Sequence, residues 1–421
     1  MKRFFLFFLI STSFCLILFS LLEYRKEYLK NKSNFNNLEN LIEDAIKPAC
    51  RYNFDKNNNI KENDIKEINI IIPKSRNWEQ NLLNAFIDKS NSISNKYKKR
   101  FKANIYLKNS KNDICKLNGR VRISGDGRDH LQRKKGYIVP SLDVNLLNGN
   151  IDGIVNFKLF LPSTRNGSSE VFVSLLLKEM GYLSPRTKLI RVNLNNQNHK
   201  MIFQEKASKE MLENNNLRES AIIESDESLM WKIRSNNGAS SNGNIFPRVV
   251  NKKWIKRNLI NQKIGLEGTK IFSKAILESW NKGGNDEEIT FSDFLLSSGN
   301  IKNRKILSRY KSHLIASGSD HALYNHNRIF YYDPITKSLL PIYYDGNSRI
   351  MDLEKGFNFS QNFKDRFISR DLTSEDINTA INEVKAINLS KFLLLLNSSG
   401  VKITESDLIK IKNQLIKNLT F

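Results

Sequence analysis

Short runs of apolar residues, several of them alternating with polar residues, predict that the first part of this chain is rich in strands. The run EINIIIP, which begins at Glu67, is the first of them. Two amphipathic helices are predicted between the strands, at residues 78–89 and 166–180, because apolar residues recur there at helical spacing. The other predicted strands are residues 101–107, 119–124, 142–147, 157–161, 188–194 and 200–203.

The pattern becomes mainly helical after residue 206. The predicted helices are residues 207–213, 305–316, 374–385 and 405–419, with a strand hairpin at 328–332 and 339–343. Strands first and helices afterwards indicate an α+β fold. The pattern therefore predicts a strand-rich part at residues 66–206 and a mainly helical part at residues 207–421.

Residues 4–22 form an uncharged run of nineteen residues, fourteen of which are Leu, Ile or Phe. As a helix this run would measure ~28 Å, close to the ~30 Å hydrocarbon core of a bilayer. It predicts one N-terminal transmembrane helix within residues 1–24, followed by a polar tether rich in Asn and Lys at residues 25–65. A cleaved signal peptide is the alternative, although no small-x-small cleavage site follows the run.

The positive residues around this run favour opposite orientations. Four Lys and Arg residues within 25–32 favour a large domain on the cytoplasmic side. A short basic head before an apolar run, here Lys2 and Arg3, is typical of a domain that is exported. We expect the extracytoplasmic side for the large domain.

The composition adds a charge excess, with 67 Lys and Arg against 43 Asp and Glu and a formal net charge of +24. An excess of this size is compatible with binding to nucleic acid or anionic lipid. The positive residues are spread along the chain rather than gathered in one block, so nucleic acid is not the partner we expect. The 40% of hydrophobic residues are enough for a packed core, and three cysteines are too few for a disulfide scaffold.

The segment around the second hairpin has the residue types of a phosphoryl-transfer site. Asp320 is followed by Asn325 and Asn327, and the hairpin leads into Tyr344-Asp345-Gly346. Phosphoryl transfer needs one carboxylate to orient the attacking hydroxyl, and an Asn with a second carboxylate to hold Mg²⁺ against the phosphates. Spacing from Asp320 favours Asn325, whereas adjacency to the next strand favours Asn327, which we prefer. Ordinary turn residues beside a hairpin would give the same composition.

The strand-rich part offers the complementary positive groups. The loop SGDGRDH, residues 124–130, lies between two predicted strands, although it lacks the G-x-G-x-x-G pattern of a phosphate-covering loop. Lys158 is on a predicted strand, and Glu170 begins the helix that follows. A lysine on a strand exposed to solvent is the alternative interpretation of Lys158.

Four blocks of the sequence resemble the CotH kinase family, which comprises spore coat protein H and its bacterial relatives. The blocks are ISGDGRDH, FKLFLPSTRNGSSEVF, FQEKASKEMLENNNLRESAII and DHALYNHNRIFYYDPITKSLLPIYYDG, and the resemblance covers roughly residues 67–350. The resemblance implies an atypical protein-kinase-like fold of two lobes. It also implies transfer of the γ-phosphate of ATP, with Mg²⁺ or Mn²⁺, to Ser or Thr of a protein acceptor in the bacterial envelope.

The resemblance implies a role for each matching residue. Asp320 would be the catalytic-loop carboxylate, Asn327 and Asp345 would be metal ligands, and Asn325 is the reserve ligand. The ATP-contacting residues would be Lys158 with its partner Glu170, Arg165 on the same anionic ligand, and Glu205 near the adenine. Two departures are Asp143 and Asn145 where relatives often have basic residues, and the absence of a second Asp after Asp345.

Three other functions fit the sequence less well. A non-catalytic envelope or coat assembly protein would keep the fold as a binding platform, and a basic surface would dock anionic polymer or lipid. A metallohydrolase built on Asp126, His130, His321 and Asp345 would lack the usual His-x-Asp or His-Glu-x-x-His spacing.

Overall fold

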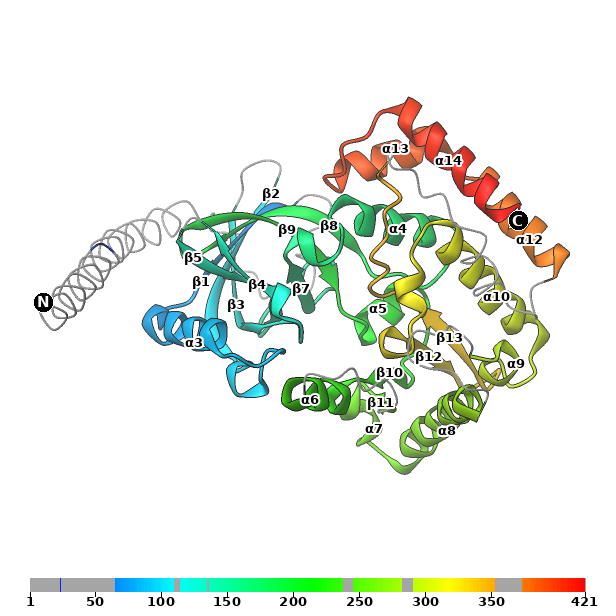
Figure 1. Ribbon diagram of the computed structural model, residues 1–421, viewed down its shortest axis with the longest axis horizontal. Coiled ribbons are helices and arrows are strands. Elements are labelled where there is room, and N and C mark those ends of the chain that lie inside the picture. The colour runs from blue at the N-terminus through cyan, green and yellow to red at the C-terminus, as the bar shows by residue number, and fades with distance from the viewer. Residues whose placement is uncertain are drawn as a thin grey trace, which may run out of the picture.

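A computed structural model gives the architecture of the chain (Figure 1). The structure describes residue 23 and residues 65–420, except for 110–113, 135, 238–244, 282–290 and 353–372. The predicted membrane anchor and nearly all of the tether thus lie outside the described residues. Within the described residues, no helix is long and apolar enough to cross a membrane.

Seven strands of the first part close into a barrel, seen on the left of Figure 1. Their order around the barrel is β1, β2, β3, β6, β7, β9 and β8. They are β1 (Ile65–Ile71), β2 (Phe101–Asn109), β3 (Ile114–Ile123), β6 (Leu142–Leu146), β7 (Asn156–Phe160), β8 (Thr187–Leu194) and β9 (Gln197–Glu205). The helix α3 (Ser75–Ile87) follows β1, and the short hairpin of β4 (Leu131–Lys134) and β5 (Tyr137–Pro140) leads into β6.

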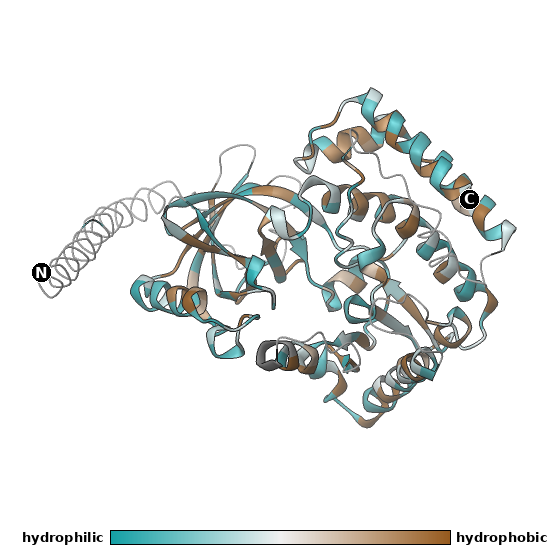
Figure 2. Cartoon of the chain, in the orientation of Figure 1, coloured by the Kyte–Doolittle hydropathy of each residue, from teal (hydrophilic) through white to brown (hydrophobic). Residues whose placement is uncertain are grey.

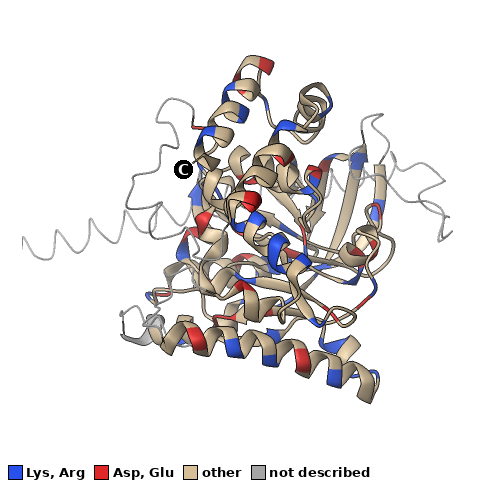
Figure 3. Ribbon diagram, turned by 90° about the vertical axis from the view of Figure 1, so that its right-hand side faces the viewer, with Lys and Arg blue, Asp and Glu red and all other residues tan. Residues whose placement is uncertain are grey.

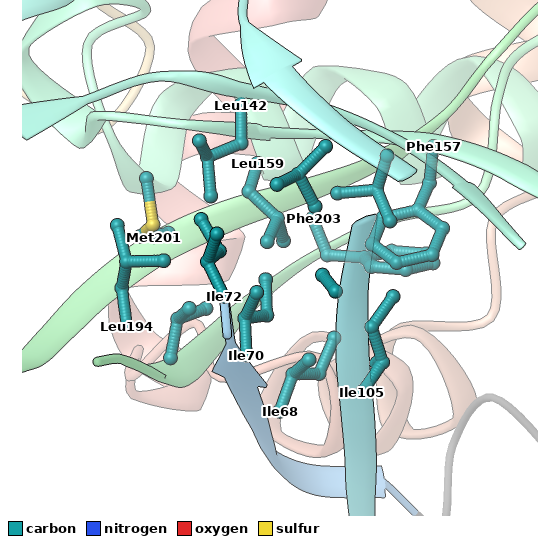
Figure 4. Close-up of a cluster of buried hydrophobic side chains, with 14 of the residues drawn as sticks. Ile68, Ile70, Ile72, Ile105, Leu142, Phe157, Leu159, Leu194, Met201 and Phe203 are labelled. Atoms are coloured by element: carbon teal, nitrogen blue, oxygen red, sulfur yellow. The ribbon is translucent and has the colours of Figure 1, made fainter. Parts of the chain in front are cut away.

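Apolar side chains from the barrel strands fill its interior. Figure 4 shows Ile70, Ile105, Phe157 and Phe203 among those that point toward one another. All four are buried, and the rings of Phe157 and Phe203 lie 4.8 Å apart between their centres. The alternation read from the sequence is therefore the inward and outward alternation of a barrel wall.

The kinase-like two-lobed fold that the resemblance implied is wrong for this structure, although the α+β class is right. The barrel differs because β1 pairs with β2 in the antiparallel sense and with β8 in the parallel sense, and these two pairings close the sheet. The β1 and β8 partners, such as Ile68 and Val192, lie more than 120 residues apart along the chain. No local pattern of residues records a pairing over that distance.

A second sheet of four strands begins the other part of the molecule. Its order is β11 (Phe246–Val249), β10 (Ile222–Asp226), β12 (Ile329–Asp333) and β13 (Ser338–Ile342). The long helix α8 (Leu259–Asn281) packs on this sheet at Gly268, where an added side chain would collide with Ile223 and Tyr332. The remaining helices of this region are α5 (Lys209–Asn214), α6 (Ser228–Asn237), α7 (Lys252–Ile255) and α9 (Asp293–Leu296).

The C-terminal helices form a third region, with their hydrophobic sides turned inward (Figure 2). They are α10 (Ile301–Ala316), α12 (Ser374–Lys385), α13 (Leu389–Ser398) and α14 (Glu405–Leu419). The helix α4 (Ser168–Glu179), which follows β7, packs among them: the ring centres of Phe172 and Phe392 lie 5.4 Å apart. Helix α4 thus packs with the C-terminal helices, although it lies within the strand-rich part of the sequence.

The charged residues on the face shown in Figure 3 are mixed in sign, with Lys and Arg lying among Asp and Glu. Ion pairs occur at the surface of the described structure, such as Lys305 with Glu375 and Lys391 with Glu179. The charge excess of the sequence is thus accompanied by local pairing on this surface.

We predict that Phe203→Ala lowers the free energy of unfolding by about 3–5 kcal/mol, because it leaves a cavity in the barrel core. Phe203 is 1% exposed. The measurement is denaturant unfolding. Phe294→Ala is the matched control, since Phe294 is 55% exposed and its loss should change stability by about 0.5 kcal/mol or less. Equal losses in the two variants would contradict the assigned barrel core.

Candidate functional site

A cavity of about 360 Å³ lies where the end of the barrel meets the second sheet. The barrel contributes Lys158 from β7 and the loop at 124–126, and the second sheet contributes residues from β10 and from the segment after β13. The 3₁₀ turn Asn325–Asn327, just before β12, adds Asn327. The barrel and the second sheet, which are far apart in the sequence, thus both line the cavity.

Lys158 and Arg165 both donate hydrogen bonds to the hydroxyl of Tyr344. The Lys158 Nζ to Tyr344 Oη distance is 3.1 Å, and the Arg165 Nη2 to Oη distance is 3.0 Å. Both positive groups also lie over the Tyr344 ring, at 5.0 Å and 4.6 Å from its centre. Tyr344 therefore forms the wall of the cavity, and two cations converge on its one oxygen atom.

Arg165 lies behind Tyr344 and is 2% exposed. Its Nη1 is 2.8 Å from Asp345 Oδ1, yet within the described residues neither Nη1 nor Nε makes a hydrogen bond of good geometry. Burial alone would lower the pKa of Arg165, but Asp345, Tyr344 and Glu170 together raise it. The Arg165 guanidinium is therefore a fixed positive charge, and its Nε and Nη1 groups can still donate hydrogen bonds to a ligand.

Asp345 is held in its ionised form. Burial would raise its pKa, but Arg165 and then His321 outweigh that effect and lower the pKa to about 2. Its backbone is in the left-handed region, with φ of 52°, and its Oδ1 faces Arg165 Nη1 at 2.8 Å. Arg165 therefore stabilises the negative charge of Asp345, a role that a bound metal ion could also fill.

His321 connects Asp345 to Asn327. Its Nδ1 lies 2.9 Å from the carbonyl oxygen of Asp345 and 3.5 Å from Asp345 Oδ1. Asn327 Nδ2 donates to the His321 carbonyl at 2.9 Å. Burial would lower the pKa of His321, but Asp345 raises it overall. The hydrogen bonds of His321 in the described structure thus reach Asp345 and Asn327.

Glu170 is fully buried but is not joined to Lys158 by an ion pair in the described structure. It accepts hydrogen bonds from Tyr343 Oη at 2.9 Å, from Gly346 N at 3.2 Å and from Gln204 Nε2 at 3.3 Å. Burial raises its pKa, and Asp345 adds to this rise. Glu170 thus fixes the segment that carries Tyr344 and Asp345.

Glu205 lines the cavity, but Arg186 occupies its carboxyl group. Two hydrogen bonds, from Arg186 Nη2 at 2.7 Å and from Nε at 2.9 Å, form a buried pair. A bidentate pair of this kind leaves little capacity for a further ligand. The predicted contact between Glu205 and adenine therefore finds no free carboxyl group here.

Asp320 and Asn325 lie less centrally than the sequence suggested. Asp320 does not line the cavity, and the charged groups that affect it are His321 and Arg349. Burial raises the pKa of Asp320. Asn325 is buried, and its Oδ1 has no hydrogen-bond partner in the described part of the chain. Asn327, which lines the cavity, is the better placed of the two amides.

The loop at residues 124–130 meets the cavity through Ser124, Gly125 and Asp126. Lys98, far away in sequence, pairs with Asp126 and offsets its charge. Arg128 of the same loop donates to the backbone oxygens of Ala85 and Phe86. The loop is therefore anchored to α3 rather than turned fully toward the cavity.

A cluster that sequence reasoning missed surrounds Asp143. Arg122, Arg100 and Lys206 contact its carboxyl group at 2.8, 3.1 and 3.3 Å. Burial would raise the pKa of Asp143, but Lys206, Arg122 and Arg100 outweigh it and keep the pKa well below its usual range. The strand register places Arg122 of β3 opposite Asp143 of β6, and the sequence alone does not give this register.

The residues fit a divalent ion held jointly with a phosphate ligand. In the described structure no three His, Cys, Asp or Glu side chains form a metal cage. Mg²⁺ usually binds through one or two protein oxygens together with substrate phosphates. Asp345 Oδ2 and Asn327 Oδ1 have no hydrogen bond among the described residues, and His321 ties the two residues together. They are the oxygens that could hold such an ion.

Comparison with known proteins gives no assignment, since neither a protein-family model nor a curated protein matches this chain.

We predict that Arg165→Met costs about 3–5 kcal/mol at pH 7, because it leaves the buried Asp345 charge uncompensated. Asp345 contributes stability above its unfolded pKa of ~3.9 and loses it as the pH falls toward its folded value of about 2. The difference between wild type and variant should therefore shrink as the pH falls through that window. Denaturant unfolding at pH 7, 4 and 2.5 measures it.

Arg257→Met is the control for this prediction, because Arg257 pairs with Glu219 at the surface and its side chain is 55% exposed. It should change stability by about 0.5 kcal/mol or less. A cost for Arg165→Met that stays the same at every pH would argue against the pairing with Asp345.

Proposed function

We propose that this chain transfers the γ-phosphate of ATP, with Mg²⁺ or Mn²⁺, to a Ser or Thr hydroxyl of a protein. The observation that carries the proposal is the convergence of Lys158 and Arg165 on the oxygen of Tyr344, with ionised Asp345 directly behind. Both cations now share the neutral oxygen of Tyr344. A charged phosphate oxygen would bind them more strongly, because a hydrogen bond to an ionised acceptor is stronger than one to a neutral acceptor.

Each residue has a distinct task in this proposal. Lys158 and Arg165 would bind phosphate oxygens and stabilise the charge that develops during transfer. Asp345 and Asn327 would hold the divalent ion, which supplies charge neutralisation at the β- and γ-phosphates when it is bound. His321 would keep both metal-holding residues in place, and Glu170 would fix the segment that carries Asp345.

Tyr344 must turn away before a phosphate oxygen can reach Arg165, because its hydroxyl now takes that position. The buried Nε and Nη1 of Arg165, which lack well-aligned partners, support an additional anionic ligand at this point. The described conformation is therefore the closed state of the proposed phosphate site.

The CotH resemblance implies the same reaction and the same class of acceptor. Because the strands close into a barrel, the proposal depends on the arrangement of the site residues and not on a kinase-like fold.

A non-catalytic binding platform is the second candidate. Arg165 already neutralises Asp345, and Tyr344 already occupies both cations. If this closed arrangement is permanent, the chain neither binds nor uses ATP.

We predict that the purified full-length chain incorporates label from γ-labelled ATP with Mg²⁺ or Mn²⁺. Lys158→Met and Asp345→Asn should each lower the rate by about 10²–10³-fold, the loss typical when one stabilising group of a transition state is removed. Lys391→Met is the matched control, since Lys391 is exposed and pairs only with Glu179 among the described residues.

The alternatives give different results in the same assay. A wild-type chain that incorporates no label and shows no melting shift with Mg²⁺ and ATP would support the platform. Binding that follows polyanions and collapses with salt would instead support the basic surface.

A further inference from the structure

The proposed reaction needs a group that accepts the proton of the attacking hydroxyl. A general base must come within hydrogen-bond reach of that hydroxyl, which enters through the cavity. Asp320, the carboxylate expected from the sequence, does not line the cavity. The carboxylates that do line it are Asp126, Asp143, Glu205, Glu224 and Glu227.

Four of these five carboxylates are already committed to cations. Asp126 pairs with Lys98, Asp143 with three cations, Glu205 with Arg186 and Glu224 with Arg248. A carboxyl group that already accepts hydrogen bonds from a cation has fewer oxygen lone pairs free for a ligand. Glu227 has no ion pair in the described part of the chain.

Glu227 lies between β10 and α6, and its position is fixed by Trp231 one turn further on. Trp231 Nε1 donates to Glu227 Oε2 at 2.6 Å, and Trp231 N donates to the Glu227 carbonyl at 2.9 Å. Within the described residues Oε1 receives no hydrogen bond. One oxygen of the carboxyl group is thus held while the other remains available to a ligand.

The charges around Glu227 suit a proton acceptor. Burial raises its pKa to about 7, and Asp126 and Asp345 contribute to the rise. Trp231 and Lys158 act in the opposite direction, and Arg248 on β11 is close enough for its charge to interact. An acceptor with a pKa near the working pH is both available and basic enough for proton transfer.

We propose that Glu227 is the general base of the phosphoryl transfer, an inference that rests on the proposed function. The acceptor hydroxyl gives its proton to Glu227 as its oxygen forms a bond to the γ-phosphorus. The bond between that phosphorus and the bridging oxygen breaks, and ADP leaves with the electron pair. Glu227 then releases the proton to solvent.

The test compares full-length wild type with Glu227→Gln, using transfer of label from ATP to the chain itself as the activity. Glutamine keeps an acceptor for Trp231 but cannot take a proton. We expect a rate about 10²-fold lower at pH 7, with the melting shift by Mg²⁺ and ATP unchanged. The wild-type rate should rise with pH through about 7, and this rise should be absent in the variant.

Two further variants keep the comparison sharp. Glu227→Asp retains the carboxyl group at a shorter reach, so its rate should be intermediate and its rise with pH should remain. Glu213→Gln is the control, because Glu213 lies on the exposed side of α5 in a surface pair with Lys209. A carboxyl carbon resonance that titrates near pH 7 in wild type and is missing in Glu227→Gln gives a readout independent of activity.

The outcomes separate the two proposals. If wild type transfers label and Glu227→Gln transfers it equally fast, Glu227 is not the base, while the proposed function stands. If wild type transfers no label and binds no ATP, both proposals are overturned.

Discussion

The buried contact of Arg165 with Asp345 and Tyr344 is the interaction on which the rest of the site depends. It joins the segment after β7 to the segment after β13, more than 170 residues away, with 3% of the Arg165 side chain and 17% of the Asp345 side chain exposed. A buried charge that loses its partner is far more costly than an exposed one. The contact thus links the barrel side of the cavity to the segment that carries Tyr344 and Asp345.

Periodic patterns predicted the local elements well and their assembly poorly. The helices Ser374–Lys385 and Glu405–Leu419 occur at the predicted residues, because each has a strong amphipathic pattern and a threonine cap. Helix α13 was missed because its short apolar run fits a strand equally well. The β1–β8 pairing and the position of α4 depend on contacts between distant residues, which periodicity does not record.

The site could be predicted in its residue types but not in its pairings. Lys158 and Asn327, both singled out from the sequence, line the cavity, and Arg165 and Asp345 form an ion pair beside Tyr344. The sequence did not indicate that Arg165, rather than Lys158, would pair with an acidic residue, or that Glu205 would be bound by Arg186. Such choices depend on side-chain direction in three dimensions, and small differences in burial decide them.

Helix α4 lies in the first half of the sequence, but its packing is completed only by helices near residue 400. During synthesis the barrel strands emerge before residues 389–419, so Phe172 lacks its partner Phe392 for that interval. The backbone carbonyl of Ser399, just after α13, also accepts a hydrogen bond from the backbone N–H of Leu189 on β8, so α13 is joined to the barrel as well. Apolar surface that waits for a later partner during synthesis is a target for chaperones.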